Sequence, residues 1–205
     1  MATELREAMS QIAEIRQQIA RTELFRGYRS VPVAFSGVLA GLAAVAQSIW
    51  IPHPMLEIRW YLTLWLSVAA VGIFAAGLEM ALRARRDTRW AREHTWLAVE
   101  QFLPSVIAGG LTTLVLARSN ESVLWVLPGL WSVFFSLGVF ASRRLLPRAI
   151  IGVAFYYLLA GLAGLALATG EYALSPWAMG LPFGGGQLLA ALVLYQTLER
   201  NHGFS

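Results

Sequence analysis

The sequence predicts an all-α integral membrane protein with six transmembrane helices arranged as three hairpins, preceded by a cytoplasmic amphipathic helix. Three observations predict this class. Of the 205 residues, 57% are apolar and only 14% are charged, which is too apolar for a soluble domain of this size. The chain contains six apolar runs of about 20 residues, the length that crosses a hydrocarbon core. Arginines gather in alternate loops, as they do on the non-translocated side of a membrane.

The segment 1–29 has the spacing of an amphipathic helix. Its apolar side chains recur every three or four residues and form a stripe of Leu5, Met9, Ile12, Ile15 and Ile19. The opposite face carries mixed charge, which is less basic than a typical membrane-surface helix. We expect the stripe to bind a protein partner or another copy of itself, although the membrane interface or the chain's own loops would also cover it.

The predicted bundle covers residues 30–200 and leaves a short tail at 201–205. Ser30 suits a helix cap and Pro32 suits a first helical turn, so the first span begins there without a cleaved signal peptide. The expected spans are 31–51, 60–82, 96–117, 123–141, 149–169 and 176–198.

The distribution of arginine predicts the orientation. All 16 basic residues are arginine, and six spans place every one except Arg59 and Arg118 on a single side. Both termini are therefore expected in the cytoplasm, with the bundle in a bacterial inner membrane. Because the arginines lie beside apolar runs, we expect lipid head groups or a protein partner, and no nucleic acid, as their counter-charge. The arginines expected to make these contacts are Arg83, Arg85, Arg86, Arg89, Arg143 and Arg144.

Small residues recur at similar places in the odd-numbered spans, at 40–42 (AGL), 108–111 (AGGL) and 160–162 (AGL). A triplicated hairpin and convergent helix packing explain this pattern equally well. The amino-acid sequence at 127–131 (LPGLW) and from 179 (MGLPFGGGQ) to 200 (LER) resembles that of a group of small bacterial six-span membrane proteins of unknown function. That resemblance implies the six-span fold and no activity. The hairpin layout is also similar to that of the acid-resistance membrane protein family of enteric bacteria, in layout only.

Two carboxylates interrupt the apolar runs, Glu79 in the second span and Glu100 in the third. Each is about 6 Å inside the cytoplasmic end of its span. As a functional site, the two carboxylates, with Gln101 beside them, would share a proton or bind a cation. As structural residues, they would pair with arginines of the intervening loop, which this shallow depth favours.

A second candidate site lies in the sixth span, where a proline precedes three glycines and a glutamine: Pro182, Gly184, Gly185, Gly186 and Gln187. Such a segment can unwind and expose its backbone to a ligand. The glycines can equally provide a flat packing surface, with Gln187 bonded to a neighbouring span.

No catalytic motif is present. The chain has no cysteine, and its three histidines, His53, His94 and His202, are expected on different sides of the membrane, so neither a metal nor another cofactor is predicted. The sequence favours a non-enzymatic regulator or accessory subunit that acts through its N-terminal helix and arginine-rich loops. The alternative is a small proton- or cation-linked transporter or channel that uses Glu79, Glu100 and a kinked sixth span.

Overall fold

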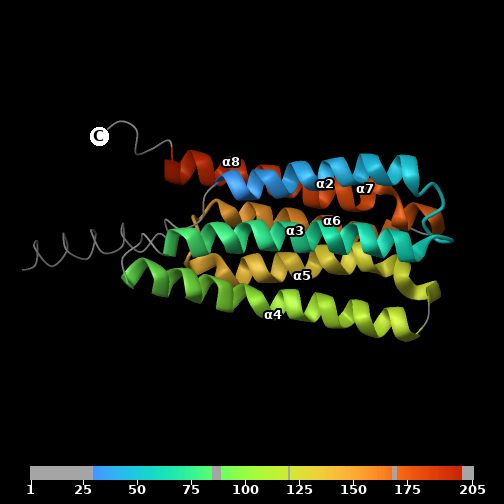
Figure 1. Ribbon diagram of the computed structural model, residues 1–205, viewed down its shortest axis with the longest axis horizontal. Coiled ribbons are helices and arrows are strands. Elements are labelled where there is room, and N and C mark those ends of the chain that lie inside the picture. The colour runs from blue at the N-terminus through green and yellow to red at the C-terminus, as the bar shows by residue number, and fades with distance from the viewer. Residues whose placement is uncertain (1–29, 85–88, 120, 168–169, 200–205) are drawn as a thin grey trace, which may run out of the picture.

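The structure is a computed structural model that describes residues 30–84, 89–119, 121–167 and 170–199 (Figure 1). The predicted amphipathic helix at 1–29 and the tail at 201–205 lie outside the described residues. The described chain is helical, and no strand occurs in it. Six of its helical segments are long and apolar enough to cross a membrane, which confirms the predicted all-α, multi-pass class.

The helices follow the apolar runs closely. The first three spans are single helices: α2 (Ser30–Trp50), α3 (Ile58–Ala84) and α4 (Arg89–Ser119). The fourth span opens with the short helix η1 (Glu121–Val126) and continues as α5 (Leu127–Ala141), and the fifth is α6 (Ile150–Leu167). The sixth span is a succession of α7 (Pro176–Met179), η4 (Gly180–Gly185), α8 (Gly186–Leu194) and η5 (Tyr195–Glu199).

Two boundaries differ from the expected ones for local reasons. Helix α4 begins at Arg89 rather than at residue 96, because the charged residues that precede the apolar run have good helix propensity. The fourth span starts with a 3₁₀ helix that gives way to α5 next to Pro128. A proline lacks the N–H group and crowds the carbonyl four residues earlier, so one unbroken α-helix does not run through this point.

The six spans lie side by side along the long axis of the molecule (Figure 1). Helix α2 packs against α3 on one side and against the sixth span on the other, α6 packs against α8, and α5 lies between α4 and α6. The most extensive contact joins α5 to α6, whereas α3 and α4 touch each other only sparsely. These last two helices also bury the smallest share of their residues, so they form the most exposed edge of the bundle.

Glycines set the closest helix contacts. A Cβ atom added to Gly161 of α6 would lie 2.7 Å from the Gly129 carbonyl oxygen of α5, so only glycine allows these two backbones to meet. Similarly, Gly37 of α2 faces Gly184 of η4, at 3.1 Å from an added Cβ to the Gly184 carbonyl oxygen. Of the three small-residue patches noted in the sequence, the one at 160–162 therefore packs closely, whereas a Cβ added to Gly41 or Gly110 would meet nothing within 4 Å.

The two ends of the bundle differ in charge and in covering. The arginine-rich end holds the connection from α5 to α6, in which Arg143, Arg144 and Arg148 are all exposed. The arginine-poor end carries the connections 51–57 and 121–126 together with η3 (Gly170–Leu174). One buried cluster that includes Tyr61, Trp65 and Leu174 fills the arginine-poor half. A second cluster, around Tyr157, fills the arginine-rich half.

Candidate functional site

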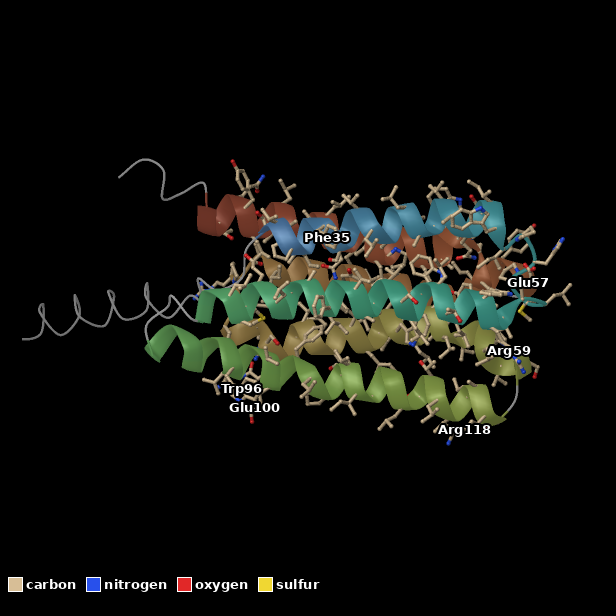
Figure 2. All side chains as sticks on the ribbon, in the orientation of Figure 1. Phe35, Glu57, Arg59, Trp96, Glu100 and Arg118 are labelled. Atoms are coloured by element: carbon tan, nitrogen blue, oxygen red, sulfur yellow. The ribbon has the colours of Figure 1, made fainter. Side chains whose placement is uncertain are left out.

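The two carboxylates that interrupt the apolar runs do not point at each other. Glu79 is half-buried in α3 and interacts with a neighbour, whereas Glu100 is exposed on α4. Figure 2 shows Glu100 beside Trp96, directed away from the rest of the bundle. Because α3 and α4 also touch only sparsely, the structure does not bring the two side chains together as a proton-sharing pair would require. Their functional role stays a prediction.

Gln101 turns inward where its neighbour Glu100 turns outward. The side chain is half-buried, and its Oε1 atom is buried without a hydrogen-bond partner among the described residues. The buried Ser142, in the short helix η2 (Ser142–Arg144) that contacts α4, has an unpartnered hydroxyl oxygen as well. Two buried polar atoms near the arginine-rich end therefore lack a hydrogen-bond partner among the described residues.

The arginines expected to contact lipid or a partner are described only in part. Arg143 and Arg144 are exposed in η2 and are free to reach a membrane surface. Arg85 and Arg86 lie outside the described residues, as do the side chains of Arg83 and Arg89. The binding of lipid or protein by this group stays a prediction.

The proline and glycine segment of the sixth span is wound, although not as an ordinary α-helix. Residues Gly180–Gly185 form a π-helix, a wider helical turn that is frequent at functional sites. The backbone therefore does not unwind here. Tyr156 of α6 fixes this turn from outside, because its hydroxyl donates a hydrogen bond of 2.8 Å to the Leu181 carbonyl oxygen.

Each of the three consecutive glycines has its own neighbour. Gly184 faces the backbone of α2, with Gly37 O and Gly41 N each 3.5 Å from an added Cβ. A Cβ on Gly185 would lie 3.0 Å from the Tyr156 hydroxyl, and one on Gly186 would lie 2.5 Å from the Tyr157 ring. The segment therefore contacts α2 on one side and two tyrosines of α6 on the other.

This arrangement matches the packing interpretation of the segment more closely than the ligand interpretation. Pro182, Gly184 and Gly186 are buried, and Gln187 is half-buried with its Cβ 3.1 Å from the position of a Cβ added to Gly37. Gly184 and Gly186 therefore face other spans, whereas Gly185 is exposed beside Tyr156. Ligand binding by these residues stays a prediction.

Gln47, at the arginine-poor end, is a fully buried polar side chain. Its Nε2 donates to the Leu174 carbonyl oxygen at 2.7 Å, and its Oε1 accepts from Trp65 Nε1 at 2.8 Å. Gln47 is 0% exposed and Trp65 is 2% exposed. One amide thus joins α2, α3 and η3, the third of which covers this end of the bundle.

A stripe of three residues at the start of α3, one just before the helix and two within it, leads from the surface to this amide. Glu57, Tyr61 and Trp65 are spaced four residues apart, which places them on one face of a helix. The Glu57 backbone carbonyl accepts from Tyr61 N at 3.1 Å, so the helical turn between them is complete. Glu57 Oε2 and the hydroxyl oxygen of the fully buried Tyr61 are both buried and lack a hydrogen-bond partner among the described residues.

Sequence reasoning missed this group. Gln47 is the last strongly polar residue before the end of an apolar run, and Glu57 stands in a short loop beside an interfacial tryptophan, so neither position attracts attention by itself. The four-residue spacing of Glu57, Tyr61 and Trp65 is the signal that would have found it. Spacing alone does not show burial, which depends on η1 and η3 from distant parts of the chain.

The fold and these groups define a multi-pass helical membrane protein with a closely packed interior. The described residues contain no group of three or more His, Asp or Glu side chains that would hold a metal ion. Comparison with protein-family models, curated proteins and solved structures finds no match to this chain.

Proposed function

We propose that this protein is a non-enzymatic accessory or interaction subunit of a bacterial inner membrane, built from three helical hairpins with both termini in the cytoplasm. The bundle anchors and orients a cytoplasmic surface formed by the N-terminal segment and the arginine-rich loops. The stripe of Leu5, Met9, Ile12, Ile15 and Ile19 binds the partner. Arg143 and Arg144, which are exposed, bind anionic lipid head groups at the same side.

The main support for this proposal is that the helices pack closely in the middle of the bundle. At Gly129 and Gly161 the backbones of α5 and α6 meet directly. Three buried hydroxyl groups of α4 and α5 donate to main-chain oxygens: Thr113 to Gly109, Ser132 to Pro128 and Ser136 to Ala154. Side chains engaged in this way stabilise a fixed scaffold, whereas a transport path needs polar groups that face a cavity.

The alternative function, a proton- or cation-linked transporter that uses Glu79 and Glu100, has less support. Glu100 points away from the bundle, and the sixth span is wound where a substrate site would need exposed backbone. An exposed carboxylate near the end of a span suits an interfacial residue that meets head groups, solvent or a partner chain.

Co-purification tests the proposal. The full chain is extracted in a mild detergent, and the proteins that remain bound are identified by mass spectrometry, in parallel with a variant that lacks residues 2–26. We expect both forms to insert in the membrane, because the first span has its own cap and proline, and only the full chain to retain a stoichiometric partner.

Point variants separate the stripe from the segment as a whole. Replacing Ile12 and Ile15 by Gln should release the partner, because both belong to the apolar stripe. Replacing Glu14 and Gln17 by Ala, on the opposite face, provides the matched control and should leave it bound. Equal recovery of the same protein by all forms, or failure of the deletion variant to insert, would contradict the proposal.

A further inference from the structure

The arginine-poor end holds two buried oxygen atoms whose hydrogen-bonding needs are unmet. Glu57, the residue before α3, and Tyr61, one turn further along, each carry a buried oxygen atom, Glu57 Oε2 and the Tyr61 hydroxyl oxygen, that has no partner among the described residues. Tyr61 is 0% exposed, whereas Glu57 is half-buried and lies at the surface end of the stripe. The pair therefore reaches from the surface into the sealed cluster around Trp65.

A buried carboxylate oxygen without a donor is costly, and proteins meet this cost by pairing the charge or by coordinating a cation. Figure 2 shows Glu57 at the same end of the bundle as Arg59 and Arg118, the two arginines of this end. Both arginines are exposed, and neither forms a bond to the buried oxygen. The missing positive charge is therefore not supplied by these side chains.

From this geometry we propose that Glu57 and Tyr61 form a binding site for a small monovalent cation of the size of sodium. Glu57 Oε2 supplies the negative charge and the Tyr61 hydroxyl supplies a neutral oxygen. Two further oxygen atoms are Gln47 Oε1 and the Leu174 carbonyl, because the Gln47 amide is bonded to Trp65 and Leu174 of the same buried cluster. Each of these oxygens has a second lone pair besides the one that accepts the hydrogen bond. Hard cations prefer such an all-oxygen environment.

The charge of the site selects the class of cation. Calcium sites in proteins gather several carboxylates around the ion, and magnesium usually keeps several waters. The described residues hold no group of three acidic or histidine side chains, and a single carboxylate balances a single positive charge. The ion reaches the site from the arginine-poor end, where Glu57 is partly exposed. It links α3 to the amide that joins α2 and η3, so its binding should stabilise the whole end of the bundle.

Thermal unfolding in detergent measures this stabilisation. Sodium chloride is exchanged for N-methylglucamine chloride at constant ionic strength, with a potassium series beside it. When sodium exceeds its Kd about tenfold, the unfolding temperature should rise by about 3 to 6 °C. Glu57→Gln should abolish the rise, and Tyr61→Phe should weaken the apparent sodium affinity roughly tenfold. Tyr172→Phe removes an exposed hydroxyl from η3 at the same end of the bundle and should leave the response unchanged.

Sodium binding is also measured on the unaltered protein, so that the proposal is tested even where a variant does not fold. Equilibrium dialysis with radioactive sodium should find about one ion per chain, displaced by excess unlabelled sodium and unaffected by N-methylglucamine. Absence of saturable sodium binding would overturn the proposal. A sodium response that persists in Glu57→Gln, or one that N-methylglucamine reproduces, would overturn it as well, because it would reflect a general effect of salt.

Discussion

Trp65 Nε1 donates a hydrogen bond of 2.8 Å to Gln47 Oε1, from the second span back to the first. Trp131 Nε1 donates at the same distance to Thr113 Oγ1, from the fourth span back to the third, and both pairs are separated by 18 residues. In each case an indole N–H from the returning helix meets a polar side chain of the outgoing helix. Corresponding bonds at corresponding separations favour the interpretation of these two hairpins as repeats of one unit.

We expect Gln47→Leu to destabilise the protein by roughly 1 to 3 kcal/mol. The substitution removes two hydrogen bonds and leaves both the Trp65 N–H and the Leu174 carbonyl unpaired, and bonds between membrane helices contribute about 0.6 to 1.7 kcal/mol each. Unfolding in mixed micelles measures the change. Gln196→Leu, at an exposed position of the sixth span, is the control and should alter stability by less than about 0.5 kcal/mol. Equal effects at the two positions would contradict a structural role for Gln47.

The α5–α6 contact leads to a second prediction, on the stability of glycine variants. Gly161→Ala should destabilise by about 1 to 3 kcal/mol, because the new methyl group would lie 2.7 Å from the Gly129 carbonyl oxygen and the backbones would have to separate. Gly152→Ala, on the same helix, meets nothing within 4 Å and should be neutral or stabilising by up to about 1 kcal/mol. The same unfolding assay distinguishes them. Tolerance of both substitutions would mean that α5 and α6 are not in backbone contact.

Apolar runs, arginine placement and proline positions were sufficient to predict the six spans, because each acts locally along the chain. Helix pairing was harder to predict. The dominance of the α5–α6 contact depends on Gly129 and Gly161 meeting across two spans, and small residues occur in most of the other spans as well. The proposed cation site was missed for a related reason. Glu57 is a loop residue in the sequence, and only the covering segments η1 and η3 turn its surroundings into a buried cluster.

The π-helix of the sixth span makes a prediction that depends on two residues together. Gly185→Ala should be destabilising, because its methyl group would lie 3.0 Å from the Tyr156 hydroxyl, and the hydrogen bond to Leu181 holds that hydroxyl in place. Tyr156→Phe removes the hydroxyl and should itself cost about 0.6 to 1.7 kcal/mol. In the Tyr156→Phe background, Gly185→Ala should become neutral or stabilising, since the next atom is 3.9 Å away. A double-mutant cycle measures the coupling, and additive effects would count against this contact.

The proposed orientation can be tested directly, because the natural chain has no cysteine. His53→Cys and Arg144→Cys introduce single thiols at exposed positions on opposite ends of the bundle. With both termini in the cytoplasm, a membrane-impermeant maleimide should label position 53 in intact cells and position 144 only after permeabilisation. The reverse pattern would invert the topology and move the arginine-rich end to the outside.

The last prediction concerns the two intramembrane carboxylates. If Glu79 and Glu100 are interfacial residues, Glu100→Gln should change stability by only about 0 to 1 kcal/mol, because the side chain is exposed and any ion pair that it forms is partly solvated. Glu79→Gln should cost more than Glu100→Gln, since Glu79 is half-buried and interacts with a neighbour. If the pair instead shared a proton in a dehydrated layer, either substitution would relieve like-charge repulsion and stabilise the fold at neutral pH. Unfolding of both variants at pH 5 and pH 8 separates the two cases. A gain in stability at pH 8 that disappears at pH 5 would make a proton-linked transporter the better explanation, because protonation at pH 5 already removes the repulsion.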